Sequence, residues 1–271
     1  MEQEALMCLR SVPVRRYKGF AMTKEEQILR NRFLDLANTT YRRGIPTATD
    51  FLSLYEQDFY YQVKKELPPV YSMLSGGNSI SERKMVLFLP EQDYAGDYLP
   101  IAVLKLVPVN ERFSDELSHR DYLGALMNLG IERSVLGDIM IDDKAAYLYC
   151  KENIADYIIE NLYMVRHTSM SVTRVSESVE IVPKFEEIKG SVASPRLDSV
   201  LALAFHSSRS KLSGLIEGKK VFVNSRLVES NSYQMKNGDV VSVRGYGKFI
   251  YKETVGTTKK GRSYISLNKY T

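Results

Sequence analysis

The stretch that decides the fold of the C-terminal third reads SPRLDSVLALAFHSSRSKLSGLIEG, from Ser194 to Gly218. Ser194 is a candidate helix N-cap, and the charge of Asp198 suits the dipole of a first helical turn. An apolar stripe at helical spacing follows, made of Val200, Leu201, Ala204 and Phe205. The pattern predicts an amphipathic helix that packs through this stripe.

A second helix is predicted directly after the first. His206-Ser207-Ser208 breaks the first helix and caps the second, which carries Arg209, Ser210 and Lys211 near its start and ends at Gly218. Short apolar runs at 221–223 and 240–244 predict two strands, with turns at Asn224 and at Asn237-Gly238-Asp239. The segment is therefore predicted to be a helix pair on a small sheet.

A hairpin is predicted at the C-terminus, with strands at 249–255 and 263–267. Its tip, 256–262, carries Lys259, Lys260 and Arg262 around a glycine. Three cations at a tip could follow an RNA groove through phosphate contacts. An exposed, flexible turn explains the same residues equally well.

Charge separates this region from the rest of the chain. From Lys189 onward there are 15 Lys and Arg against 5 Asp and Glu, a net charge of +10, whereas the preceding residues carry −6. A basic module on a mildly acidic body favours a polyanionic partner such as RNA. A solvated basic tail is the alternative.

Four short motifs in order resemble the S4 RNA-binding domain: Arg196-Leu197-Asp198, Ser208-Arg209-Ser210, Val223-Asn224 and Gly238-Asp239. The resemblance implies a helical hairpin on a short sheet whose second helix and nearby loops contact RNA phosphates. Together with the hairpin tip, the residues expected to bind RNA are Arg196, Ser208, Arg209, Ser210, Lys211, Lys219, Lys220, Arg226, Lys248, Lys259, Lys260 and Arg262. Ser225 departs from the family, which usually has Gly after the Asn.

The rest of the chain predicts an α+β protein. A capping box at Thr23 and Glu26 begins a helix over 24–38, and a second helix is expected over 50–66. From Ile101 the expected order is strand, helix, strand, strand, helix, strand, the ferredoxin- or RRM-like βαββαβ arrangement. The predicted domains are a mainly helical region at 1–79, an RRM-like domain at 80–176, an acidic connector at 177–188 and an S4 domain with its hairpin at 189–271.

The predicted central domain also resembles the corresponding domain of the YlmH-type S4 proteins of bacteria. The matching residues are His119-Arg120-Asp121-Tyr122-Leu123-Gly124-Ala125-Leu126, Leu129-Gly130-Ile131 and Gly137-Asp138-Ile139. The resemblance implies cytoplasmic RNA binding in a family linked to cell-division gene clusters and to large ribosomal subunits carrying peptidyl-tRNA. The expected partners are therefore rRNA or tRNA and the ribosome.

The central domain lacks the RRM signature for reading bases. Tyr147 and Tyr149 share one face of a predicted strand, but 101–107 has no aromatic residue. The sheet is therefore expected to be a packing surface. His119, Arg120 and Arg133 are the better candidates for a secondary RNA contact, with helix capping or ion pairing as the structural alternative.

No cofactor, metal site or membrane span is predicted. Cys8 and Cys150 offer neither a disulfide framework nor zinc spacing, and no apolar run approaches 18 residues. Arg196-Leu197-Asp198 resembles the catalytic triplet of pseudouridine synthases, but here it is predicted to begin a helix. The sequence signatures of methyltransferases, synthetases and kinases are incomplete. The chain is thus expected to be a non-catalytic RNA-binding protein; a cell-division adaptor that binds proteins and, less favoured, an RNA-modifying enzyme are the alternatives.

Overall fold

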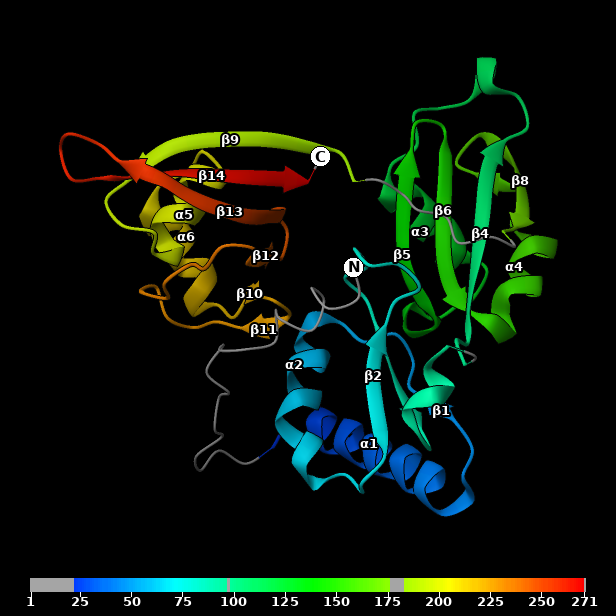
Figure 1. The fold of residues 1–271 in the computed structure, drawn as a ribbon. Helices are drawn as coiled ribbons and strands as arrows, with labels where there is room; N and C mark the ends of the chain where they lie inside the picture. Colours follow the sequence, from blue (N-terminus) through cyan, green and yellow to red (C-terminus); the bar gives the residue numbers. More distant parts are fainter. Residues whose placement is uncertain (1–21, 97, 176–182, 271) are drawn as a thin grey trace. The chain divides into compact units, whose positions relative to one another are not determined.

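The computed structural model describes residues 22–96, 98–175 and 183–270. Contacts divide the chain into two compact units, whose described parts are 22–175 without residue 97, and 183–270. The α+β class predicted from the sequence is confirmed, since helices pack on antiparallel sheets in both units (Figure 1). Among the described residues, no helix is long and apolar enough to cross a bilayer.

The first unit begins with two capped helices. Thr23 and Glu26 form the predicted capping box, and the helix runs past Asn38 to Gly44, whose φ of 64° ends it. The second helix begins after Ser53 and continues as a 3-10 turn over Lys64–Glu66. Within residues 22–96 these helices accompany three strands in the order β1-β3-β2. The elements are α1 (Lys24–Arg43), β1 (Thr47–Ala48), α2 (Leu54–Val63), β2 (Tyr71–Ser75) and β3 (Met85–Leu89).

The rest of the first unit has the predicted βαββαβ order. Within residues 98–175 the strands form one antiparallel sheet in the order β5-β6-β4-β8-β7, in which β4 lies between β6 and β8 as the split-βαβ arrangement requires. The short β7 pairs at the edge and was not predicted. The elements are β4 (Ile101–Pro108), α3 (His119–Asn128), β5 (Leu136–Asp142), β6 (Ala145–Lys151), α4 (Ala155–Asn161), β7 (Met164–Val165) and β8 (Thr168–Arg174).

The second unit joins the S4-like segment to the C-terminal hairpin. Within residues 183–270, six strands form a sheet in the order β11-β10-β12-β13-β14-β9. Helices α5 and α6 pack their apolar residues against it, with Leu201, Leu212 and Phe249 fully buried in the shared core (Figure 1). The elements are β9 (Phe185–Val192), α5 (Leu197–Ala204), α6 (Arg209–Glu217), β10 (Val221–Val223), β11 (Arg226–Leu227), β12 (Val240–Val243), β13 (Gly247–Thr257) and β14 (Ser263–Tyr270).

Three local predictions need correction. Strand β3 pairs with β2 along its whole length, so the boundary predicted after residue 79 falls inside a hairpin of the N-terminal sheet. The last residues of the predicted acidic connector, 185–188, begin β9, which pairs with β14. Ser194 does not cap α5; the chain bends at 193–195, Arg196 is extended and bridged to Gln234, and the helix starts at Leu197. In each case backbone pairing with another segment overrides the local pattern.

Residues between 51 and 89 cover one face of the central sheet. Tyr149 is only 1% exposed and packs in a cluster with Phe51, Leu87 and Leu89. The backbone N–H of Phe51 donates to the carbonyl oxygen of Ser134 at 2.8 Å. This part of the sheet is therefore a packing surface, as the sequence predicted, and its buried tyrosine is unavailable for base stacking.

One arginine, Arg83, crosses this interface, and a second, Arg133, lies beside it. The guanidinium of Arg83 donates to the carbonyl oxygens of Phe51 and Leu136, at 2.6 and 3.0 Å. Arg133 donates through Nη1 to the carbonyl oxygens of Leu136 and Gly137, at 2.6 and 2.9 Å. Burial, and then the neighbouring charge of Arg83, lower the pKa of Arg133 to about 10. Both side chains thus satisfy backbone carbonyls where the N-terminal residues meet the central sheet.

The closeness of the contact at Gly137 gives a first prediction. A Cβ at this position would lie 2.8 Å from the Phe51 ring and 3.0 Å from Cβ of Tyr149. We expect Gly137→Ala to lower the free energy of unfolding by about 1–3 kcal/mol, because the core cannot take the added methyl without shifting. Urea unfolding followed by circular dichroism measures it.

The matched control is Gly124→Ala in α3, where a Cβ meets nothing within 4 Å. It should be neutral or stabilising by up to about 1 kcal/mol, because Ala is the better helix former. Adding Phe51→Leu should return part of the stability lost in Gly137→Ala. Equal unfolding midpoints for Gly137→Ala and the unmodified chain would contradict the packing described.

Arg133 provides a second prediction, with Arg120 as its matched control. Arg133→Gln should cost about 1–3 kcal/mol of stability, because it removes the side-chain donor of the Gly137 carbonyl and leaves the Leu136 carbonyl with Arg83 as its side-chain donor. Arg120→Gln removes an exposed guanidinium from the same domain and should change stability by less than about 0.5 kcal/mol. Similar unfolding midpoints for the two variants would show that the Arg133 hydrogen bonds contribute little.

Candidate RNA interface

A buried carboxylate organises the start of the helix pair. Asp198 is 8% exposed, and its Oδ2 accepts a hydrogen bond from Nη2 of Arg196 at 3.3 Å. Nε of Arg196 lies 3.3 Å from Oδ1 of the same carboxylate. Oδ1 also accepts the backbone N–H of Ser199 at 2.9 Å. Asp198 therefore fixes the guanidinium of Arg196 at the beginning of α5.

The second arginine reaches the same group from the next helix. Nη2 of Arg209 donates to Oγ of Ser199, and that hydroxyl lies 3.3 Å from Oδ1 of Asp198. Two predicted RNA-binding residues, Arg196 and Arg209, are thus brought to neighbouring atoms by Asp198 and Ser199. The sequence analysis did not select Ser199. Its position directly after the acid is a local signal that could have suggested it.

The first turn of α6 adds backbone donors to these cations. Ser208 caps the helix, as predicted, and its Oγ accepts the N–H of Lys211 at 3.4 Å. No acidic side chain lies in this turn, and Arg209, Ser210 and Lys211 are all exposed. The free N–H groups and positive dipole end of a helix attract phosphate oxygens. The arrangement is therefore suited to bind an RNA phosphate.

Other predicted cations lie in the loops and strands of the same unit. Lys219 and Lys220 are exposed in the turn after α6, and Nζ of Lys219 is 3.8 Å from a carboxylate oxygen of Glu229. Arg226 begins β11, after Asn224 and Ser225.

The turn before Arg226 explains the family's usual glycine. Asn224 and Ser225 have φ values of 51° and 61°. A two-residue hairpin turn of this kind needs positive φ at both central positions, which Gly adopts without strain. Ser225 adopts the same conformation, so the substitution leaves the turn in place.

The hairpin tip is a separate region. Lys259 and Lys260 are exposed beyond the end of β13, whereas Lys248 lies at its start. The 11 residues of β13 place these ends about 30 Å apart. Arg262 does not extend from the tip with the lysines, because its Nη2 donates to the carbonyl oxygen of Ser191 in β9 at 2.7 Å. The predicted residues therefore form two groups on the second unit.

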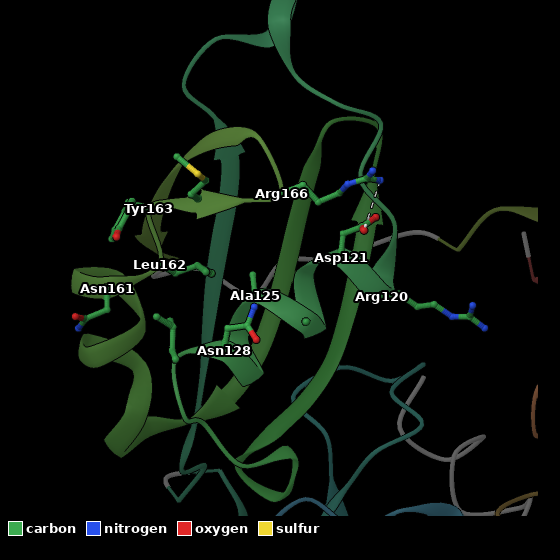
Figure 2. A pocket seen from close by; sticks show the side chains of 11 residues that line it. Arg120, Asp121, Ala125, Asn128, Asn161, Leu162, Tyr163 and Arg166 are labelled. Atoms are coloured by element: carbon green, nitrogen blue, oxygen red, sulfur yellow. Dashed lines mark ion pairs between the residues drawn. The ribbon is translucent and has the colours of Figure 1, made fainter.

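The three candidates in the central domain do not form one site. Arg133 is committed to backbone carbonyls, and the pKa of the nearby His119 is lowered by burial and then by the charge of Arg133. Arg120 instead lines a groove of about 480 Å³ formed by α3 and residues 161–166. Its side chain points away from Asn128 in Figure 2, while Arg166 lies 3.7 Å from the Asp121 carboxylate. Arg120 and His119 are exposed to a partner, whereas Arg133 is half-buried.

Metal binding finds no support in the described ranges, where no group of three or more His, Cys, Asp or Glu side chains is placed to hold an ion. Cys150 is buried, and burial raises the pKa of its thiol to about 12. The chemistry available at the helix pair is thus charge and hydrogen bonding to an anion.

Comparison with known proteins connects these features to families. Residues 98–178 match the putative RNA-binding domain in YlmH, and residues 195–241 match the S4 domain. The ribosome-associated protein quality control protein P2 of Bacillus subtilis is 29% identical over 251 residues, covering 91% of this chain and 96% of that protein.

Two further similarities are partial. The small ribosomal subunit protein uS4 of Chromohalobacter salexigens is 48% identical over 54 residues, which are 20% of this chain and 26% of uS4. The structure of the cell division protein YlmH from Streptococcus pneumoniae has a TM-score of 0.47 and 22% identity, covering 62% of this chain and all of that one.

Both matched domains occur in the order that the motifs predicted, and the Bacillus subtilis relative spans almost the whole chain. Residues 98–178 and 195–241 therefore match, in this order, the two domains expected of a YlmH-type S4 protein.

Proposed function

We propose that this protein is a non-catalytic factor that binds structured RNA through its S4 domain. The observation that carries the proposal is the pair Arg196 and Arg209, joined through Asp198 and Ser199 beside the open first turn of α6. Guanidinium groups held in place lose less side-chain freedom on binding a phosphate than free ones do. Lys211, two residues after Arg209, adds a further cation to the same surface.

The remaining predicted residues would extend this contact along the RNA backbone. Lys219, Lys220, Arg226 and Lys248 would meet phosphates near the helix pair. Lys259 and Lys260 would meet phosphates about 30 Å away, at the other end of β13. Arg262, fixed to β9, would support the tip. A secondary contact through the central domain is assigned to Arg120, with His119 nearby in sequence.

The RNA is proposed to be rRNA or tRNA on the large ribosomal subunit, in ribosome-associated quality control in the bacterial cytoplasm. This step rests on the name of the Bacillus subtilis relative, which is similar over almost the whole chain. The carboxylate that a pseudouridine synthase would need, Asp198, is bound to Arg196 and Ser199. The proposal therefore includes no catalytic step.

A double charge reversal provides the third prediction. Arg209→Glu with Lys211→Glu should weaken binding to all RNA ligands, ribosomal subunits included, by at least a hundredfold, because both side chains would then repel phosphate. Sedimentation with purified large subunits and fluorescence anisotropy with short RNAs measure the loss. Arg32→Glu with Lys65→Glu, two exposed cations of the N-terminal residues, makes the same change in net charge and should have little effect.

The salt dependence of binding separates a phosphate contact from a general charge effect. Arg209→Gln should reduce the slope of log affinity against log salt by about one, since one phosphate contact is lost. Unchanged affinity in the double variant would remove the support for the S4 interface. If the double variant keeps its affinity and protein partners still copurify after RNase treatment, the alternative of a cell-division adaptor would be favoured.

A further inference from the structure

One end of the second unit's sheet carries aromatic rings paired with lysines. We define the cation–aromatic cluster as Phe205, Tyr246 and Tyr270 with Lys211, Lys248 and Lys269. Nζ of Lys248 lies 4.7 Å from the centre of the Tyr270 ring. Nζ of Lys211 lies 5.8 Å from the ring of Tyr246, and that of Lys269 lies 5.9 Å from the ring of Phe205. Each ring of the cluster therefore has an ammonium group over it.

The rings form two separate groups. Phe205 packs edge-on against Tyr246 at 5.6 Å and against the buried Phe249 at 5.8 Å. Tyr270 packs against Phe185 at 4.8 Å, and Phe185 is 40% exposed. The first group is thus anchored in the core through Phe249. Because side chains alternate along a strand, Tyr270 lies on the sheet face opposite to Lys269, and with Phe185 it reaches solvent at the ends of β14 and β9.

Strand register explains why these residues meet. Phe249 in β13 is opposite Lys269 in β14, and Tyr270 is opposite Phe185 in β9. The end of β14 is therefore placed between the start of β13 and the start of β9. Most of the cluster lies outside the residues that match the S4 family, which end at 241. The family resemblance consequently does not assign this surface.

The cluster is also next to the phosphate-binding centre. Lys211 belongs to both, because it lies in the N-terminal turn of α6 and its ammonium group is over Tyr246. Lys269 is balanced in part by Glu186, whose carboxylate is 3.8 Å from Nζ. Packing alone accounts for the contact of Phe205 with the core. Tyr246 is half-buried and shares Lys211 with the helix pair, and Tyr270 lies beside Lys248, two residues after Tyr246.

We propose that the cation–aromatic cluster binds unpaired bases of the RNA whose phosphates the helix pair contacts. Base stacking needs a planar ring at the surface, and a nearby lysine can hold the phosphate of the same nucleotide. Tyr246 and Tyr270 would stack on bases, and Lys211 and Lys248 would turn to the backbone. The inference rests on the proposed function and adds a single-stranded segment to the RNA that is recognised.

Two RNAs test the inference: a blunt hairpin and the same hairpin with a single-stranded extension of four nucleotides. We expect Tyr246→Leu with Tyr270→Leu in the full chain to weaken binding of the extended RNA about tenfold and of the blunt hairpin by less than twofold. Tyr246→Phe with Tyr270→Phe keeps the rings and should bind both RNAs as the unmodified chain does. Fluorescence anisotropy gives the affinities, and circular dichroism shows whether each variant folds.

A photocrosslink on the unmodified chain covers the case in which the leucine variant fails to fold. With 4-thiouridine in the extension, crosslinks to residues 246–248 or 269–270, located by mass spectrometry, would support the inference. Crosslinks confined to other residues, or equal losses on both RNAs, would overturn it. Binding of neither RNA by the unmodified chain would instead refute the proposed function, which distinguishes the two failures.

Discussion

Asp198 keeps a carboxylate almost buried at the start of α5, where an unpaired charge would be costly. The ion pair with Arg196 and the hydrogen bonds from Ser199 offset that cost, and through Ser199 they also reach Arg209. The position of both arginines, and with them the helix-pair surface, depends on this group. A residue that looks catalytic in the sequence is therefore the internal support of the proposed binding surface.

The central domain has the element order of an RRM-like fold, but part of its sheet packs against other residues of the same unit. Its βαββαβ order gives a sheet that could present aromatic rings to RNA. Here the N-terminal residues cover Tyr149, and Arg83 and Arg133 supply donors to the carbonyl groups at that contact. Bases could reach this part of the sheet only if the residues packed on Tyr149 moved away from it. An RNA contact through Arg120, which is exposed on α3, therefore fits the structure better.

Strand β9 enlarges the sheet of the second unit. It pairs with all eight residues of β14 and extends the sheet beyond the segment that resembles S4. Gly190 permits this, because a Cβ there would lie 2.6 Å from Cδ1 of Leu203 in α5. The added strand places Phe185 beside Tyr270 and so completes the aromatic end of the sheet.

The sequence alone determined the features that rest on neighbouring residues: the capping box at Thr23, the helix pair, the Ser208 cap, the βαββαβ order and the basic S4 region. Local hydrogen bonds, periodicity and charge encode these features directly. Only the tertiary structure decided that β3 pairs with β2, that β9 joins the sheet, that Arg133 faces carbonyls, and that lysines and aromatics from 185 to 270 meet at one edge. The β9–β14 pairing and the aromatic contacts join residues far apart in the chain, and strand register, which no local pattern specifies, sets them. The β2–β3 hairpin and the carbonyl contacts of Arg133 join nearer residues, and the packing around them sets their geometry.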